Sequence, residues 1–337
     1  MGPPYGRYPP SGWAGTERVV SELVDSWIDA GREPVLFGPS ASRGGFRHSC
    51  PVRGPYPDPV AFGPAEERRV VEAAYSSFVL GQLSDVEVVH SHLPAFTLLA
   101  HAAGLEVPLV ETLHWVSAPV PLPGVTYVAI SHSQKASLGL PATTPVIHHG
   151  LSPERYPIGL DPDPDKAAFL GRLSPEKGAE IAVEAARRAG LRLEVGGGPR
   201  IEDREYFDAR LAPRLAQPHV SYLGEITGLP KLRLLRSSSA VLCPVRWKEP
   251  FGLVLIEAML SGTPVIAFGE GAIPEIIEEG VTGFIARDLD HMVELLRMVT
   301  GPNAGNFDRQ RCRDRAIELF SAQRMADRYL ELFQALA

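Results

Sequence analysis

Two glutamates, Glu249 and Glu257, stand eight residues apart, and a short turn between them leads into an apolar segment. Pro250 is tolerated in the first turn of a helix, so a helix is expected to begin at Pro250 or the next residue. The first amides of such a helix lack partners within it and carry the positive end of its dipole. These amides belong to Phe251, Gly252 and Leu253. The segment therefore has the features of an anion site, and phosphate is the usual anion.

The spacing of the two carboxylates also has chemical meaning. At 1.5 Å of rise per residue they would lie roughly 10–12 Å apart, which is about the length of a diphosphate. One carboxylate could then accept hydrogen bonds from a ribose diol and the other from a sugar, and such charge-assisted bonds are the stronger kind. Taken alone, the same spacing also fits a surface helix with two solvated glutamates.

Two further stretches of the sequence help to interpret this segment. Residues 249–275 resemble the donor-binding signature of retaining glycosyltransferases of family 4, and residues 169–178 and 193–199 match further parts of it in the expected order. The similarity is dense over residues 168–285 and patchier over 12–157. The resemblance implies a GT-B fold, in which two Rossmann-like, doubly wound α/β domains face each other across a cleft.

Two cations fit the chemistry that this resemblance implies. When a sugar leaves a nucleotide-diphosphate donor, negative charge grows on the diphosphate, and positive charge placed in advance stabilises it. Arg172 follows a strand end, and Lys177 lies in the first turn after Ser174, a plausible helix cap. Arginine can bind two phosphate oxygens, whereas lysine acts as a point charge. Outside this context, both would be interpreted as solvated surface cations.

The N-terminal half supplies three further candidates. Residues 12–17 resemble the family's glycine-rich loop, so the resemblance implies that Gly15 contacts the donor diphosphate. His114 follows a predicted strand, and the corresponding family histidine faces the donor sugar near the reacting centre. His92 is a candidate for the acceptor side. His148 and His149, which replace a family turn, are interpreted as structural.

No metal site is expected. His90 and His92 have the i, i+2 spacing of a ligand pair, but no third ligand completes a set. Two Asp-x-Asp segments, at 161–163 and 288–290, are interpreted as structural, the first within a linker and the second as a helix cap. We therefore expect no metal and no cofactor, with Arg172 and Lys177 providing the positive charge.

Composition limits the class of protein. The chain has 337 residues, of which 45% are apolar and 22% charged, with a net charge of −7. This length suits two soluble domains, and the acidic balance argues against nonspecific nucleic-acid binding. No apolar run approaches the length of a membrane-spanning helix. Three cysteines without metal-like spacing indicate a reducing, cytoplasmic location.

Alternating strand and helix patterns predict a parallel sheet in each half. The expected domains are residues 1–157 on the acceptor side, a stiff acidic linker at 158–166, a donor-binding domain at 167–318 and a C-terminal helix at 319–337. The resemblance implies that this last helix returns to the N-terminal domain. Strands are expected in the first half at 33–38, 86–90, 108–114 and 125–131, and in the second from 167 and at 191–195, 220–223, 240–243 and 264–268.

The first ten residues depart from the family pattern. They are rich in Pro and Gly and cannot form a central strand, although the first strand of a doubly wound sheet is central. Either the true start lies upstream or this sheet is built differently, and we favour an upstream segment. The neighbouring strands are then expected to have unpaired edges.

The predicted function is retaining, metal-independent transfer of a sugar from a nucleotide-diphosphate sugar to an acceptor hydroxyl, with His114 and Glu249 near the reacting atoms. Another GT-B enzyme, such as a nucleotide-sugar epimerase or a phosphorylase, is an alternative, as is a non-catalytic nucleotide-sugar-binding protein. A dehydrogenase fits poorly, because no Gly-x-Gly-x-x-Gly opens a helix. The partners are then the donor and a carbohydrate, lipid or small-molecule acceptor. Arg43, Arg47 and Arg53 could meet an anionic acceptor, although a solvated loop is the simpler interpretation.

Overall fold

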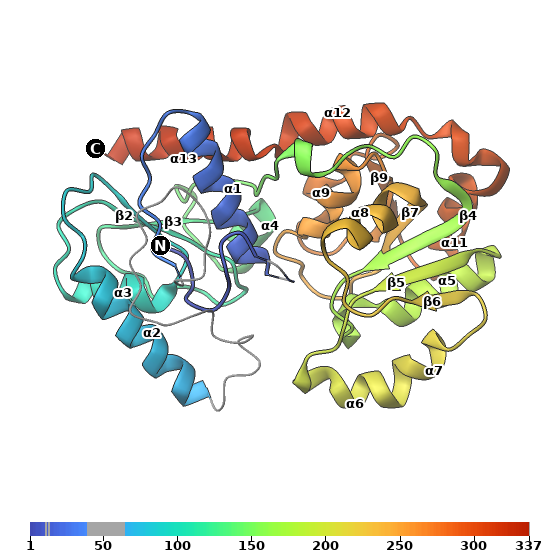
Figure 1. The fold of residues 1–337 in the computed structure, drawn as a ribbon, viewed down its shortest axis with the longest axis horizontal. Coiled ribbons are helices and arrows are strands. Elements are labelled where there is room, and N and C mark those ends of the chain that lie inside the picture. Colours follow the sequence, from blue (N-terminus) through green and yellow to red (C-terminus); the bar gives the residue numbers. More distant parts are fainter. Residues whose placement is uncertain (11, 13, 39–64, 337) are drawn as a thin grey trace. The chain divides into compact units, whose positions relative to one another are not determined.

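The computed structural model describes residues 1–10, 12, 14–38 and 65–336. The chain divides into two compact units, of which unit 1 comprises Met1–Gly150 and Ala322–Ala337, and unit 2 comprises Leu151–Ser321. Figure 1 colours the chain from its N-terminus to its C-terminus and labels many of its elements. The boundary between the units thus falls after Gly150, whereas the sequence predicted that the N-terminal domain ends at residue 157.

Unit 2 is built on a parallel sheet with strand order β6-β5-β4-β7-β8-β9. Its strands are β4 (Asp163–Leu170), β5 (Arg192–Gly196), β6 (Val220–Tyr222), β7 (Ser238–Cys243), β8 (Val265–Phe268) and β9 (Gly283–Ala286). Strand β7 is buried along its whole length, as an apolar strand covered on both faces should be. The chain fills one side of β4 first and then crosses to the other side, so the point where the order reverses lies between β4 and β7.

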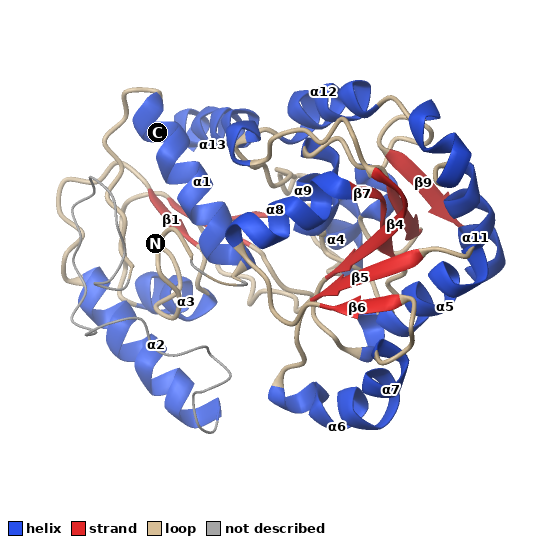
Figure 2. Ribbon diagram, turned by 45° about the vertical axis from the view of Figure 1, so that its right-hand side comes forward, coloured by secondary structure: helices blue, strands red, loops and turns tan. Residues whose placement is uncertain are grey.

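Helices cover both faces of this sheet. The principal helices are α5 (Ala179–Ala189), α8 (Gly228–Ser237), α9 (Leu253–Leu260), α11 (Leu289–Met298) and α12 (Arg309–Phe320). Helices α5 and α11 lie on the same side of the sheet (Figure 2), where their apolar residues form one core with Leu193 and Leu242. Helix α9 packs against α12, and the Cys312 thiol lies 3.7 Å from the carbonyl oxygen of Met259. The loops at the carboxyl ends of the strands are therefore held on a rigid frame.

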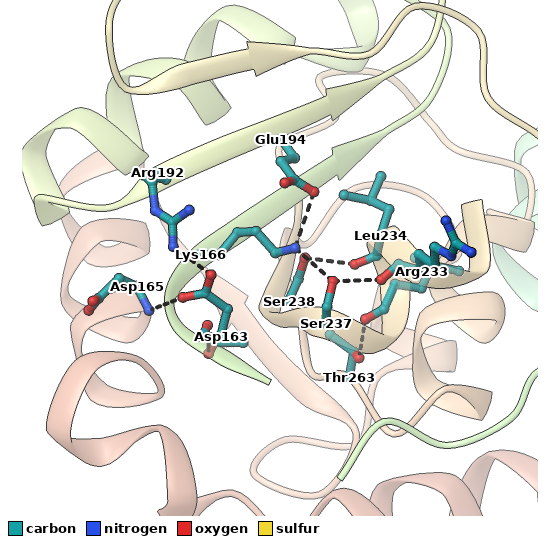
Figure 3. Close-up of polar contacts among 12 residues, drawn as sticks. Asp163, Asp165, Lys166, Arg192, Glu194, Arg233, Leu234, Ser237, Ser238 and Thr263 are labelled. Carbon is teal, nitrogen blue, oxygen red and sulfur yellow. Dashed lines mark hydrogen bonds and ion pairs between the residues drawn. The ribbon is translucent and has the colours of Figure 1, made fainter. Parts of the chain in front are cut away.

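Strand β4 begins at Asp163, so the predicted linker at 158–166 is wrong for its last four residues. Figure 3 shows why this polar segment can join the sheet. Asp163 pairs with Arg192 of β5 through a 2.5 Å contact. Lys166 is 7% exposed and donates to Ser237 at 2.6 Å and to Glu194 at 3.2 Å. Two charges of the predicted linker, those of Asp163 and Lys166, are thus paired at the start of the strand.

Unit 1 contains a smaller parallel sheet with order β1-β2-β3. Its strands are β1 (Val89–Ser91), β2 (Leu109–Thr112) and β3 (Val125–Val128), and its helices are α1 (Gly15–Asp29), α2 (Ala65–Leu80), α3 (Pro94–Ala102), α4 (His132–Ser137) and α13 (Ala322–Leu336). The C-terminal helix α13 is tied to this unit. Tyr329 shares a 2.6 Å hydrogen bond with Thr112, and Trp27 donates to the Ala326 carbonyl at 3.2 Å.

The strand predicted at 33–38 is not formed. Leu36 and Phe37 are buried there, as the apolar pattern indicated, but the segment joins no ladder. A strand needs a neighbouring backbone, and the one backbone bond of this segment within the described residues is that from the amide of Gly2 to Phe37, at 3.1 Å. In agreement with the sequence, no strand precedes α1 among the described residues.

Both units are therefore parallel α/β structures, as the sequence predicted. None of the helices in the described part of the chain combines the length and the apolar character that crossing a membrane requires.

Candidate functional site

The candidate site of unit 2 is formed by two loops at the carboxyl ends of β4 and β7, next to the point where the strand order reverses. Open α/β sheets bind ligands at such positions. The two loops contact each other directly, because the amide of Arg246 donates to the Glu176 carbonyl at 2.8 Å. Gly178 makes this approach possible, since a Cβ there would lie 2.2 Å from the Pro244 carbonyl oxygen. Its φ of +72° also favours glycine.

Glu249 is held by two donors on one oxygen. Its Oε2 accepts from the Lys177 ammonium at 2.5 Å and from the Trp247 indole N–H at 2.8 Å. The ammonium also lies 5.1 Å from the centre of the Trp247 ring, within the range of a cation–π contact. Oε1 accepts no hydrogen bond from the described residues, so one face of this carboxylate remains available to a ligand.

The main chain around Glu249 is fixed as well. The amide of Ala272 donates to the Glu249 carbonyl at 2.9 Å. Gly271, with φ of +63°, packs so closely that a Cβ would stand 2.3 Å from the Glu249 nitrogen. Gly271 is therefore required by a close backbone approach.

Glu257 has a matching arrangement. Its Oε1 accepts from the Lys231 ammonium at 2.6 Å and from the Tyr156 hydroxyl at 2.9 Å. The ammonium lies 5.7 Å from the centre of the Tyr156 ring. Oε2 accepts no hydrogen bond within the described part of the chain. Each glutamate of the pair is thus anchored through one oxygen by a lysine and an aromatic donor.

The helix between the two glutamates begins later than predicted. Helix α9 starts at Leu253, and Gly252 caps it with φ of +91°, a conformation outside the helix. Three amides were predicted in the first turn of this helix. Only the amide of Leu253 lies there, and the amides of Phe251 and Gly252 precede the helix. The Phe251 side chain is 2% exposed and packs edge-on against Phe320.

Arg172 lies beside acidic partners. It forms an ion pair with Glu176, its Nε donates to Ser174 Oγ at 3.1 Å, and Asp203 lies 3.5 Å away. Both predicted phosphate-binding cations therefore hold carboxylates in this structure. An incoming diphosphate would compete with these carboxylates for Arg172 and for the ammonium of Lys177.

In unit 1 the candidate histidines lie together. His114 Nε2 and His92 Nδ1 are 2.8 Å apart, and the His149 ring stacks on His114 with centroids 5.2 Å apart. Gln134 fixes the main chain on both sides of His114, because its side-chain amide donates to the carbonyls of Leu113 and Trp115 at 2.9 and 3.0 Å. His92 and His114 thus come together, and Gln134 is an addition to the predicted set.

Burial keeps these imidazoles neutral. It lowers the pKa of His114 to about 4, although the residue as a whole is only half-buried. Burial, with smaller contributions from neighbouring histidines, lowers the pKa of His92 and of His149 well below the usual value. A neutral pair such as His92 and His114 shares one proton in its hydrogen bond, so one ring donates and the other accepts.

Other predicted residues have simpler positions. Gly15 is the first residue of α1, after Ala14 in an extended conformation. Asp288 caps α11 by accepting from the amide of His291 at 2.8 Å, which confirms the predicted cap. Trp13, within the predicted glycine-rich loop at 12–17, lies outside the described residues, as do Arg43, Arg47 and Arg53.

The sequence did not single out Trp247, Tyr156 and Lys231. Trp247 could have been predicted from the sequence, because an indole N–H two residues before Glu249 is close enough to donate to its carboxylate. Tyr156 and Lys231 carried none, because they lie 101 and 26 residues from Glu257.

Comparison with known proteins addresses both units. The family model described as "Glycosyl transferases group 1" matches residues 153–298, and the model described as "Glycosyltransferase Family 4" matches residues 13–140. In both units the chain is thus similar to glycosyltransferases of the family 4 type. Similar solved glycosyltransferase structures give the chain the GT-B fold, in agreement with the prediction.

Individual relatives agree with this assignment. A D-inositol 3-phosphate glycosyltransferase of Mycolicibacterium paratuberculosis is 34% identical over 172 residues, which make up 46% of this chain and 39% of that protein. The Mycobacterium tuberculosis H37Ra protein of the same name is 32% identical over 199 residues, or 52% of this chain and 41% of that protein. The chain thus spans about two fifths of the length of the curated relatives it matches.

Among solved structures, AviGT4, a glycosyltransferase involved in avilamycin A biosynthesis, is 27% identical with a TM-score of 0.73, covering 98% of this chain and 92% of its own. Anabaena HepE in complex with UDP and glucose has a TM-score of 0.73 at 18% identity, covering 96% of each chain. At this identity HepE supports the fold alone.

Proposed function

We propose that this family 4-type protein transfers a sugar from a nucleoside-diphosphate sugar to an acceptor hydroxyl with retention of configuration and without a metal. The observation that carries the proposal is the pair of anchored carboxylates at the reversal point of the unit 2 sheet. Glu249 and Glu257 each keep one oxygen free of described partners, and a lysine stands beside each of them.

These contacts suggest how the donor would bind. The diphosphate would take the ammonium of Lys177 and the guanidinium of Arg172 from their present carboxylate partners, with the amide of Leu253 at the N-terminus of α9. Glu249 would accept from sugar hydroxyls through Oε1, and Glu257 from the ribose diol through Oε2. Because Trp247 and Tyr156 hold the other oxygens, both carboxylates stay oriented when a ligand arrives.

The same cations would support the reaction itself. As the bond between the anomeric carbon and the diphosphate oxygen breaks, that oxygen gains negative charge, which Lys177 and Arg172 offset. The acceptor hydroxyl forms the new bond on the face that the diphosphate leaves, and a phosphate oxygen takes its proton. The anomeric configuration is thereby retained. The role of His114 toward the donor sugar and that of Gly15 toward the diphosphate stay predictions.

The proposal that no metal is needed rests on the contacts of the two Asp-x-Asp segments. Asp163 pairs with Arg192, and Asp288 caps a helix, so both Asp-x-Asp segments have structural partners. The two lysines beside the glutamates supply positive charge at the site. We accordingly propose that the enzyme needs no cofactor besides its donor, and that it acts in the cytoplasm.

The relatives suggest substrates to try first. HepE is described in complex with UDP-glucose and with UDP and glucose, and the mycobacterial relatives are named for D-inositol 3-phosphate. A carbohydrate, lipid or small-molecule alcohol remains the proposed class of acceptor, and nucleic acid is not a proposed partner.

A transfer assay tests the proposal. UDP-, GDP-, ADP- and dTDP-sugars would be incubated with a panel of alcohol acceptors in EDTA, and nucleoside diphosphate release and the anomeric configuration of the product would be followed by chromatography and NMR. An α-linked product from an α-linked donor is expected. Activity that appears only after a divalent metal is added, or an inverted product, would contradict the mechanism, and epimerised donor without acceptor would favour an epimerase.

A further inference from the structure

Glu257 is a buried charge with one oxygen already occupied. It lies in α9, and its Oε1 accepts from two donors, the ammonium of Lys231 at 2.6 Å and the hydroxyl of Tyr156 at 2.9 Å. Because each carboxylate oxygen has about two lone-pair sites, these donors fill Oε1. Oε2 accepts no hydrogen bond from the described residues. A ligand that binds Glu257 therefore adds its donors at Oε2.

Both donors to Oε1 are themselves fixed in place. The Lys231 side chain is 14% exposed, and its ammonium lies 5.7 Å from the centre of the Tyr156 ring. Tyr156 is 2% exposed, and its carbonyl accepts from the guanidinium of Arg313. The same guanidinium donates to the carbonyl of Leu260, the last residue of α9. Arg313 thus ties the main chain of Tyr156 to the end of the helix that carries Glu257.

These contacts restrict the direction in which Glu257 can accept a hydrogen bond. A carboxylate without such partners rotates to face whichever hydroxyl arrives, but two fixed donors at Oε1 oppose that rotation. The two lone-pair sites of Oε2 therefore keep their directions. A cis-diol offers two neighbouring hydroxyl donors and can fill both sites, whereas a sugar with one hydroxyl at this position fills only one.

The unfilled site is costly because the carboxylate is buried. Little water reaches a residue that is 6% exposed, so a missing hydroxyl leaves a charged acceptor short of one hydrogen bond. A site built to bind a hydroxyl strongly rejects an analogue that lacks it. Ribose carries the 2′ and 3′ hydroxyls of a cis-diol, and 2′-deoxyribose lacks the first of them. The two nucleotides should therefore differ at least tenfold in affinity.

We propose that Tyr156 and Lys231 determine which kind of nucleotide the donor carries. By holding Oε1 of Glu257, these two positioning residues make unit 2 select a ribonucleoside diphosphate sugar over its 2′-deoxy counterpart. UDP-, GDP- and ADP-sugars then form the class of donor, and dTDP-sugars are rejected. This inference rests on the proposed function, in which Glu257 accepts from the ribose of the donor.

Titration calorimetry with matched pairs of nucleotides tests the selection. UDP, GDP, ADP and the 2′-deoxy form of each are titrated into the wild type in EDTA. For a base that binds, we expect the Kd of the 2′-deoxy form to be at least tenfold higher than that of the ribonucleotide.

Two variants test the positioning residues. Tyr156→Phe keeps the ring beside the ammonium of Lys231 but removes the hydroxyl that donates to Glu257. Lys231→Met removes the ammonium and keeps an unbranched side chain. In each variant the ratio of the 2′-deoxy Kd to the ribonucleotide Kd should fall at least threefold, because the carboxylate is no longer held in one direction.

The ratio of the two Kd values separates selection from folding. A partly unfolded variant binds both nucleotides of a pair more weakly by the same factor, so its ratio stays at the wild-type value. Lys166→Met is the matched control, since Lys166 is another buried lysine of unit 2. It pairs with the carboxylate of Glu194 at 3.2 Å and contacts α8 through Ser237. Its ratio should stay within about 1.5-fold of wild type.

Several results would overturn the inference. Equal Kd values for both members of a pair in the wild type would do so while leaving the proposed donor site intact. An unchanged ratio in Tyr156→Phe or in Lys231→Met would do the same, as would an equal fall of the ratio in Lys166→Met. If none of the six nucleotides binds in EDTA, the proposed function itself fails, and this inference fails with it.

Discussion

Replacing Trp247 with phenylalanine isolates one contact of the proposed donor site. Trp247→Phe removes the N–H that donates to Glu249 Oε2 at 2.8 Å but leaves an aromatic ring beneath the ammonium of Lys177. Glu249 is 8% exposed, so water cannot readily replace the lost donor. A hydrogen bond to a charged group contributes about 1.5–3 kcal/mol. Because Lys177 still binds the same oxygen, we expect the lower value, and about 1.5 kcal/mol corresponds to a roughly tenfold fall in kcat/KM.

Initial rates of sugar transfer over a range of donor concentrations measure this effect, with Tm recorded for each variant. Trp27→Phe is a matched control, since it removes the indole N–H that donates to Ala326 in unit 1 at 3.2 Å. We expect its kcat/KM to stay within about twofold of wild type. Trp247→Ala also removes the cation–π contact, which adds about 0.5–1 kcal/mol, so its loss should be several-fold larger. Unchanged kcat/KM in Trp247→Phe, or an equal loss in Trp27→Phe, would refute the reasoning.

Three further predictions follow from single contacts. Glu257→Gln removes the charge that would bind the ribose diol. Titration calorimetry should then show a roughly tenfold higher Kd for the nucleoside diphosphate. An unchanged Kd would contradict the proposed role of Glu257. Gly178→Ala places a Cβ 2.2 Å from the Pro244 oxygen at positive φ, so a cost of about 1–3 kcal/mol should lower Tm and activity together, and wild-type values of both would contradict the account. Burial lowers the pKa of His92 in the folded protein. As pH falls below about 6.5, the unfolded chain therefore binds a proton at this histidine before the folded chain does. The free energy of unfolding should then fall by up to ~1.4 kcal/mol per pH unit for each histidine whose pKa burial lowers in this way. Urea denaturation at pH 7.5, 6.5 and 5.5 measures this, His92→Gln should flatten the dependence, and equal stability at all three pH values would contradict it.

The sequence predicted those parts of the molecule that depend on local pattern. Strands β7 and β8 are short apolar runs with turn residues beside them, and both were placed within a residue or two. Lys177 and Glu249 were found as members of compact motifs, although their ion pair was not foreseen. A local pattern identifies residue types, whereas the partner of each side chain depends on how distant loops meet.

The wrong predictions also arise because a local pattern does not determine contacts between distant segments. Residues 33–38 carry a strand pattern, but a ladder needs a neighbouring backbone that the pattern cannot guarantee. Helix α9 begins after Gly252 because that residue takes a left-handed conformation, which a glycine permits but does not require. The donors to Glu257 come from Tyr156 and Lys231, and only the folded chain brings them together.

The central claim is that Lys177 and its neighbours in unit 2 hold a diphosphate without a metal. Titration calorimetry of UDP, GDP, ADP and dTDP into wild type and Lys177→Met, all in EDTA, tests it most directly. We predict that at least one nucleoside diphosphate binds the wild type in EDTA and binds Lys177→Met at least tenfold more weakly. Binding that needs an added divalent metal, or equal affinity in the two proteins, would contradict it.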